Sequence, residues 1–319
     1  MADTYNFLVF EPIREEGVEV LRAVGEVRYP SALDEDTLIA EIGDIDGVVL
    51  RARGRITRRL LEHAPRLKVA GRHGTGCDNV DVQAATEHGV QVVNTPDANS
   101  EAVAEHTVGL MLAVSKRLIS CDAAARAGHF DVRYTAIGRE MLGRTLGVVG
   151  AGRIGRRVAE ICHRGFGMHV FYYDIVPVPE LECDLGARRL ALHELLSSVE
   201  YITVHVPLLP QTRGMIGEAE FAVMKPEAMF FNLSRGPVVD EGSLYRALAE
   251  GRIAGAGIDV FEEEPPAIDN PLFSLENIVV TPHSAAHTEE AVLSMAMVAE
   301  DVVAVLEGRQ PKYPVNHLE

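Results

Sequence analysis

Short apolar runs alternate with longer segments of helical spacing along the first third of the chain. Runs of this kind, separated by helical segments, predict a parallel sheet that is covered on both faces. We expect one helix over residues 16–24. The expected strands of this series are residues 6–10, 48–50, 67–70 and 90–93.

A second alternating series begins at Leu146. Its number of strands is that of a doubly wound sheet. The expected strands are residues 147–149, 169–173, 201–205, 229–232, 254–259 and 278–280.

The segments outside these two series predict how the chain is divided. Residues 94–100 combine turn formers with a proline, and a long apolar helix is expected over 101–118. Residues 128–143 are expected to be irregular, and a last helix over 289–307 should stop at Gly308. We therefore expect an α/β protein of two doubly wound parallel-sheet domains with a cleft between them. Residues 1–98 and 288–319 would form a flavodoxin-like substrate-binding domain, and residues 99–287 a Rossmann dinucleotide-binding domain.

A glycine-rich turn follows the first strand of the second series. Gly150, Gly152 and Gly155 form Gly-x-Gly-x-x-Gly, which alone is compatible with an ordinary tight turn. In a strand-turn-helix context, they permit the turn, the approach of a pyrophosphate and the packing of helix on strand. Asp174 lies 22 residues after Gly152, where an acid accepts the ribose hydroxyls and repels a 2′-phosphate. Residues 175–178 offer no cation, so none is expected near this acid and the sequence predicts NAD rather than NADP.

Composition narrows the class of protein. The net charge of −17 argues against nucleic acid as a partner, and no long uncharged apolar stretch indicates a membrane span. The four cysteines show no metal-ligand spacing, so no metal is expected. The N-terminus lacks the pattern of a secretory signal, which favours a cytoplasmic protein. Few residues follow Gln310, so no appended regulatory domain is expected.

Three polar motifs follow strands of the second series, at residues 232–236, 259–265 and 281–286. Ligands of open α/β sheets bind at the carboxyl ends of the strands, so an arginine, a carboxylate and a histidine can gather there. A histidine exchanges a proton near neutral pH, and a carboxylate beside it stabilises its cation. An arginine binds a substrate carboxylate. These groups suit hydride exchange with a small anionic 2-hydroxy or 2-keto acid.

Residues 71–81, 99–107 and 150–155, together with the three late motifs, resemble the D-2-hydroxyacid dehydrogenase family, and within it most closely its D-3-phosphoglycerate dehydrogenase branch. The resemblance implies a catalytic trio of Arg235, Glu264 and His283, and it alone selects Glu264 from the acidic run at 262–264. It also implies that Asp259 lies near the nicotinamide carboxamide. Further implied cofactor contacts are Thr107, Arg153, Ile154 and Pro207.

The same resemblance implies where the substrate binds. The loop at residues 71–78 would receive the substrate carboxylate on backbone N–H groups, through Arg72, His73, Gly74 and Thr75. Arg51, Arg53, Arg72 and Arg133 are candidates for a distal anionic group, and Arg51 and Arg72 match best. His73 replaces a small residue that is common in this loop.

The expected substrate is 3-phosphoglycerate, with phosphohydroxypyruvate as its keto form. A hydroxypyruvate or glyoxylate reductase is the alternative enzyme, and a dinucleotide-sensing corepressor is a remote alternative that rests on fold-level analogy. The resemblance also implies a homodimer whose interface includes the helix over residues 101–118.

Overall fold

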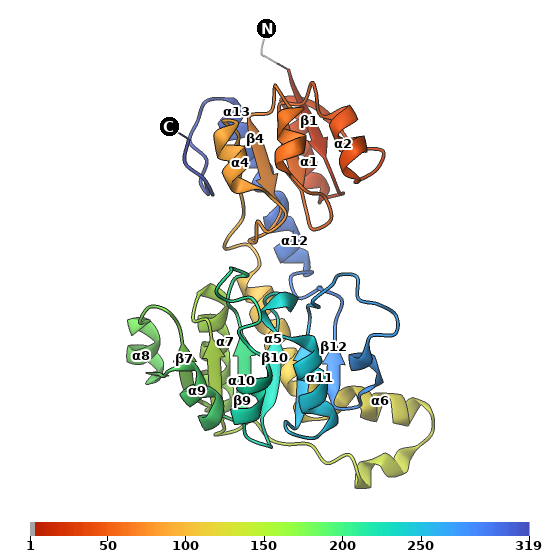
Figure 1. Ribbon diagram of the computed structural model, residues 1–319, viewed down its shortest axis with the longest axis vertical. Helices are drawn as coiled ribbons and strands as arrows, with labels where there is room; N and C mark the ends of the chain where they lie inside the picture. The colour runs from red at the N-terminus through yellow and green to blue at the C-terminus, as the bar shows by residue number, and fades with distance from the viewer. Residues whose placement is uncertain (1–3, 319) are drawn as a thin grey trace. The chain divides into compact units, whose positions relative to one another are not determined.

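The computed structural model describes residues 4–318. The chain forms two compact units (Figure 1). Unit 1 contains the chain up to Asn99 and again from His287 onward, and unit 2 is Ser100–Ala286. Within residues 4–318, no helix is long and apolar enough to cross a membrane.

Unit 1 contains a five-stranded parallel sheet with the order β2-β1-β3-β4-β5. This is the strand order of flavodoxin-like folds, so the predicted class of this unit is confirmed. The strands are β1 (Tyr5–Val9), β2 (Gly25–Arg28), β3 (Gly47–Leu50), β4 (Val69–Arg72) and β5 (Gln91–Val93). The helices between them are α1 (Glu15–Arg22), α2 (Glu35–Glu41), α3 (Arg58–Glu62) and α4 (Val82–Glu87). Strand β2 was not predicted, because charged and half-exposed residues obscure its apolar pattern.

Both faces of this sheet are buried. Val48 packs on one face in a cluster with Leu8 and Val92, while its neighbour Val49 packs on the other with Phe7. Successive side chains of a strand point to opposite faces, so a run in which every residue is apolar fills both cores. The short apolar runs of the sequence reflect this double coverage.

The predicted helix over residues 289–307 is wrong in one respect, because it is two helices. These are α12 (Glu289–Ala296) and α13 (Val298–Leu306), and Met297 between them has φ −70° and ψ 1°. The N–H of Met297 bonds to the carbonyl of Ser294, which tightens the turn and breaks the regular α-helical ladder. Val298 and Val302 of α13 pack in the core of unit 1. The segment ends as predicted at Gly308, whose φ is +73°.

Unit 2 contains a seven-stranded parallel sheet with the order β12-β11-β10-β9-β6-β7-β8. From β8 to β11 this is the doubly wound order of dinucleotide-binding folds, with one added edge strand. Six of the strands match the prediction: β6 (Thr145–Val149), β7 (His169–Tyr173), β9 (Tyr201–Val204), β10 (Met229–Asn232), β11 (Gly255–Ile258) and β12 (Ile278–Val280). The seventh, β8 (Arg188–Arg189), is two exposed arginines and carries no apolar signal.

The helices of unit 2 surround this sheet (Figure 1). They are α5 (Ser100–Ser115), α6 (Leu118–Arg126), α7 (Arg153–Phe166), α8 (Pro179–Leu185), α9 (Leu192–Ser198), α10 (Glu218–Val223) and α11 (Glu241–Ala249). Three 3₁₀ turns complete the unit: η1 (Phe130–Tyr134), η2 (Gly236–Val238) and η3 (Pro271–Ser274). The predicted helix over residues 101–118 ends earlier, at Ser115, because Arg117 takes a left-handed conformation with φ 53° and starts a new helix.

Candidate active site

The glycine turn connects β6 to α7, and two of its glycines are required by the fold itself. Gly150 has φ +93°, and a Cβ there would lie 2.9 Å from the amide nitrogen of Val206. A Cβ on Gly155 would lie 2.1 Å from the carbonyl oxygen of Gly150. Only hydrogen fits at both positions, so the turn and the close packing of α7 on β6 depend on glycine.

Gly152 is different, because a Cβ there would have no described atom within 4 Å. Its φ of −70° is also open to other residues. Helix α7 begins directly after it, and no described side chain caps that N-terminus. An open position beside uncapped helical N–H groups is the arrangement that accepts a phosphate. The residues present therefore fit the pyrophosphate of a dinucleotide.

Asp174 follows β7 and lies against this turn. Its Oδ2 accepts a hydrogen bond of 2.8 Å from the N–H of Ala151, and its Oδ1 accepts one of 3.2 Å from the N–H of Val176. The carboxylate is thus fixed beside the glycine turn, where a ribose would be recognised.

The expectation that no cation lies near residues 175–178 is wrong. Arg189 of β8 donates from Nη2 to the carbonyl oxygens of Asp174 and Ile175, at 2.8 and 3.1 Å. Strand β8 pairs with β7, so a residue 15 positions away in sequence comes to the end of β7. Sequence neighbours alone could not reveal this cation.

The other predicted cofactor residues lie on α7, α5 and the loop after β9. Arg153 and Ile154 are the first two residues of α7, and Ile154 packs partly against the core. The hydroxyl of buried Thr107 donates to the carbonyl of Val103 at 2.7 Å, so its hydrogen is already used. The carbonyl of Pro207 accepts a bond of 2.6 Å from the hydroxyl of Thr212. Their contacts with a cofactor stay predictions.

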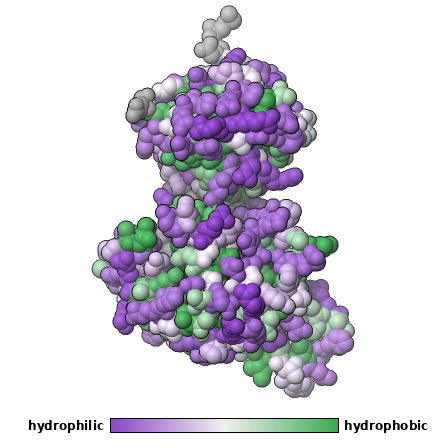
Figure 2. All heavy atoms as spheres, in the orientation of Figure 1, coloured by the Kyte–Doolittle hydropathy of each residue, from purple (hydrophilic) through white to green (hydrophobic). Residues whose placement is uncertain are grey.

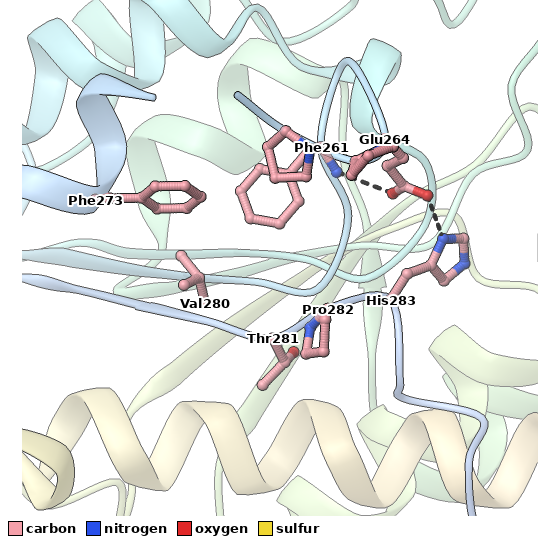
Figure 3. A pocket seen from close by; sticks show the side chains of 9 residues that line it. Phe261, Glu264, Phe273, Val280, Thr281, Pro282 and His283 are labelled. Carbon is pink, nitrogen blue, oxygen red and sulfur yellow. Dashed lines mark hydrogen bonds and ion pairs between the residues drawn. The ribbon is translucent and has the colours of Figure 1, made fainter. Parts of the chain in front are cut away.

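His283 and Glu264 form a hydrogen-bonded pair (Figure 3). The distance from His283 Nδ1 to Glu264 Oε2 is 2.7 Å. The other oxygen, Oε1, accepts a bond of 3.1 Å from the N–H of Phe261, which fixes the carboxylate. An ionised carboxylate only accepts hydrogen bonds, so Nδ1 of His283 carries the proton. Nε2 is then the nitrogen available for proton exchange.

Arg235 lies close to this pair because its loop packs directly on the backbone after β11. A Cβ on the next residue, Gly236, would lie 1.7 Å from the carbonyl oxygen of Phe261, so only glycine allows this approach. The Nη1 of Arg235 donates to the carbonyl of Ser234 at 2.8 Å. The loop after β10 thereby brings a guanidinium to the same strand ends as the histidine and the glutamate.

The pKa of Glu264 reflects its burial and the charges of His283 and Arg235. Burial raises this pKa, but the hydrogen bond and the charge of His283 lower it. The N–H of Phe261 and the charge of Arg235 lower it further, so the pKa lies below its ordinary value of 4.5. The predicted trio is therefore an electrostatically coupled group in which the carboxylate stays ionised.

A cavity of about 290 Å³ lies beside the pair (Figure 3). Most of its walls are apolar, and Glu264 and His283 are its ionisable members. An apolar surrounding strengthens the interaction between a carboxylate and an imidazolium. The lining residues are Phe261, Glu264, Pro265, Pro266, Phe273, Val280, Thr281, Pro282 and His283.

Asp259 is buried directly after β11, and its carboxylate accepts hydrogen bonds from the loop that carries His283. Its carboxylate accepts from the hydroxyl of Thr281 at 2.5 Å and from the N–H groups of Ser284 and Ala285, each at 2.9 Å. The predicted cofactor contact of Asp259 stays a prediction. Its observed bonds hold the loop.

In unit 1, the predicted substrate loop follows β4. The N–H of His73 bonds to the carbonyl of Leu50 at 2.9 Å, and that of Gly74 bonds to the hydroxyl of Thr95 at 3.0 Å. The hydroxyl of Thr75 donates to Asn99 at 2.9 Å. The N–H groups of His73 and Gly74, which were expected to bind an anion, therefore donate to groups of the protein itself.

Two arginines, Arg51 and Arg72, form a cationic cluster near His73. Burial lowers the pKa of His73 to about 4, and the charges of Arg51 and Arg72 act in the same direction, so both guanidinium groups lie near the imidazole. His73 is neutral at pH 7 as a result. Nη1 of Arg51 donates to the carbonyl of Pro12 at 2.9 Å. Arg133, the remaining candidate, lies in unit 2, where its guanidinium stacks on the ring of Tyr134.

Sequence reasoning missed Glu11, which follows β1. Its carboxylate accepts from the N–H groups of Arg51, Arg53 and Gly54, at 3.0, 3.2 and 3.2 Å. The only signal was an acid directly after a buried strand. The backbone donors of the Arg51–Gly54 turn are thus occupied by a carboxylate of the chain itself.

Comparison with known proteins agrees with this geometry. The family model described as "D-isomer specific 2-hydroxyacid dehydrogenase, NAD binding domain" matches residues 108–285. The chain is 44% identical over 313 residues to a D-3-phosphoglycerate dehydrogenase of Methanocaldococcus jannaschii, an alignment that covers 98% of this chain and 59% of the relative. It is 38% identical over 314 residues to a glyoxylate reductase of Thermococcus litoralis, covering 95% of this chain and 94% of the relative. The chain thus spans less than two thirds of the first relative and nearly all of the second.

Solved structures show the same architecture. A protein of Thermus thermophilus superposes with a TM-score of 0.91 at 34% identity, covering 98% of this chain and 100% of the other. An NADPH-dependent glyoxylate/hydroxypyruvate reductase of Sinorhizobium meliloti, in complex with NADP and malonate, superposes with a TM-score of 0.88 at 30% identity. That alignment covers 98% of this chain and 97% of the other.

Proposed function

The chain belongs to the D-isomer specific 2-hydroxyacid dehydrogenase family, and we propose on that basis that it interconverts a small D-2-hydroxy acid and its 2-keto acid with NAD. The observation that carries the proposal is the 2.7 Å bond between His283 Nδ1 and Glu264 Oε2, beside Arg235 and within an NAD-binding domain. The N-terminus of α7 after Gly152 and the carboxylate of Asp174 would hold the dinucleotide, which would supply the hydride acceptor for oxidation and the hydride donor for reduction.

His283 handles the proton of this reaction. In oxidation, neutral His283 accepts the substrate hydroxyl proton at Nε2, and in reduction its cation returns a proton to the keto oxygen. The ionised Glu264 orients the ring and stabilises the cation. Because Glu264 is itself held by the N–H of Phe261, the imidazole turns little between the two steps.

Arg235 binds the substrate. Its planar guanidinium pairs with the carboxylate and polarises the keto group, which no single point charge does equally well. The close approach of Gly236 to Phe261 keeps Arg235 near Glu264. The substrate bound by Arg235 and the proton exchanged by His283 therefore meet at the carboxyl ends of the same sheet.

The favoured substrate is 3-phosphoglycerate or, in reduction, phosphohydroxypyruvate. The cationic cluster of Arg51 and Arg72 near His73 supports a phosphate group, as does the 44% identity to a D-3-phosphoglycerate dehydrogenase. A glyoxylate or hydroxypyruvate reductase is the second candidate. Glu11 supports it, because a carboxylate already occupies the backbone donors of the Arg51–Gly54 turn and would repel a phosphate there.

NADH oxidation by the purified protein distinguishes these substrates. The panel is phosphohydroxypyruvate, hydroxypyruvate, glyoxylate and pyruvate, compared by kcat/KM at one ionic strength. A preference for phosphohydroxypyruvate that Arg72→Ala abolishes supports the first candidate. A preference for an unphosphorylated acid, unchanged in Arg72→Ala, supports the second. No turnover of any 2-keto acid would contradict the proposed activity itself.

We also propose a homodimer. The segment from α6 to the start of β6 exposes several large apolar side chains, an unusual number for a monomer surface. Figure 2 shows hydrophobic residues where Figure 1 places α6 and the turn that follows it. The exposed side chains are Leu118, Ile119, Phe130, Tyr134, Ile137 and Leu142.

Light scattering after size exclusion tests the dimer. The paired variant Phe130→Ser and Ile137→Ser should run as a monomer, whereas Ile268→Ser, a still more exposed residue outside this segment, should stay dimeric. A monomeric wild type at all concentrations would refute the proposal.

A further inference from the structure

His283 has an uncommon backbone conformation. Its φ is +52°, in the left-handed region that side chains other than glycine rarely adopt. Its side chain must nevertheless reach Glu264 in one orientation. Such a conformation persists only where neighbouring groups hold the backbone in place.

Asp259 holds the backbone on both sides of His283. Its carbonyl accepts a bond of 2.7 Å from the N–H of His283. Its carboxylate accepts from Ser284 and Ala285 on one side and from the hydroxyl of Thr281 on the other. Since only 1% of Asp259 is exposed, water offers these donors no alternative partner.

Thr281 connects Asp259 to α5. Its hydroxyl has one hydrogen, which is donated to the acceptor-only carboxylate of Asp259. The Nε2 of His106 lies 3.1 Å from the same hydroxyl oxygen. Because the hydroxyl hydrogen is already used, Thr281 must accept this bond and Nε2 of His106 must donate it. The tautomer of His106 therefore carries hydrogen on Nε2.

We infer that His106 is a positioning residue that acts through Thr281 and Asp259 to hold the loop bearing His283. The inference rests on the proposed dehydrogenase activity. The donated bond polarises the Thr281 hydroxyl and strengthens its bond to Asp259. The same carboxylate then holds the N–H groups that follow His283. His106 bonds Thr281, and its Nε2 lies 3.9 Å from Asp259 Oδ1. It therefore acts on the loop that carries His283 only through these two residues.

Two pairs of variants test this chain of bonds. Thr281→Val keeps the shape of the side chain and removes its hydroxyl, whereas Thr281→Ser keeps the hydroxyl. His106→Leu removes the donor, whereas His106→Gln presents an amide N–H near the position of Nε2. We expect kcat to fall about 10-fold to 100-fold in the Val and Leu variants. The Ser and Gln variants should recover most of that loss, and the Kd for NADH should change less than about twofold in all four.

The double variant His106→Leu with Thr281→Val gives the sharper readout. If both residues act through one bond, the double variant has about the kcat of Thr281→Val alone. Three results would overturn the inference. The losses of kcat in the two single variants could multiply in the double variant, His106→Leu and His106→Gln could lose the same kcat, or the loss could be confined to KM. A wild type that reduces a 2-keto acid while all four variants match it also refutes the inference and leaves the proposed function intact. A wild type without turnover refutes the proposed function instead.

Discussion

Glu264 Oε2 lies 2.7 Å from His283 Nδ1, and this bond assigns the two nitrogens of the imidazole to different tasks. The carboxylate, kept ionised by a lowered pKa, holds the proton on Nδ1. Nε2 is left for the substrate. Nearly half of the His283 side chain is exposed, so the exchangeable nitrogen belongs to a side chain that a substrate can reach.

His283→Ala should reduce kcat by about 10²-fold to 10⁴-fold, the contribution of a positioned general acid or base. Binding of NADH should persist, because the glycine turn and Asp174 are untouched. The chain contains no tryptophan, so calorimetry or the fluorescence of NADH itself is the suitable measurement. Turnover near the wild-type rate would remove His283 from the mechanism.

Glu264→Gln should change the pH dependence of reduction. The lowered pKa keeps Glu264 ionised down to below pH 4.5, so the wild type has the carboxylate at every usual assay pH. The amide cannot stabilise the imidazolium that donates the proton, so the reduction rate should fall and should decline at a lower pH than in the wild type. Glu263→Gln, an exposed neighbour in the same acidic run, is the control. Equal profiles for both variants would argue against the pair.

Gly152→Ala and Gly155→Ala should separate cofactor binding from folding. A methyl at Gly152 meets no described atom, so the unfolding free energy should stay within about 0.5 kcal/mol of the wild type, while NADH affinity falls. A methyl at Gly155 meets the carbonyl of Gly150 and should destabilise the protein by about 1–3 kcal/mol. Denaturant unfolding and NADH titration of both variants check this. Unchanged NADH affinity in Gly152→Ala would place the pyrophosphate elsewhere.

Asp174→Ala should admit NADPH more readily. The carboxylate repels a 2′-phosphate, and its removal leaves Arg189 as the nearby cation. We expect the ratio of kcat/KM for NADPH to that for NADH to rise about tenfold or more, which corresponds to about 1.4 kcal/mol. Adding Arg189→Ala to this variant should reverse part of the gain. A gain that is unaffected by Arg189→Ala would show that charge removal alone is responsible.

His73 should make stability depend on pH. Its pKa of about 4 lies below the unfolded value of 6.5, so the unfolded chain binds the proton first as the pH falls. Its contribution to stability is complete above pH 6.5, is lost between pH 6.5 and 4, and is constant below. From pH 7 to 5 the wild type should lose about 2 kcal/mol through this residue. His73→Gln should lack that loss, whereas the exposed control His88→Gln should retain it.

Local chemistry explains why much of the fold and part of the site follow from the sequence. The predicted strands at 169–173, 229–232 and 278–280 match β7, β10 and β12 residue for residue. All four residues of β10 are buried, and a strand covered on both faces leaves a nearly continuous apolar run. Gly155 of the turn is required by its contact with the nearby carbonyl of Gly150. An arginine, a carboxylate and a histidine could be expected at one edge because parallel strands end there, whereas the family resemblance named Arg235, Glu264 and His283.

The tertiary structure alone decided which groups meet across the sheet. Arg189 reaches the end of β7, Glu11 fills the Arg51–Gly54 turn, and His106 bonds Thr281 across 175 residues of sequence. Such pairs leave no periodic signal, since each depends on strand order and on side-chain direction. The sequence therefore determined most of the strands, the dinucleotide turn and the residue types of the site. Packing of the sheet determined the tautomers, the occupied donors and the cation beside Asp174, because these are properties of neighbours in space.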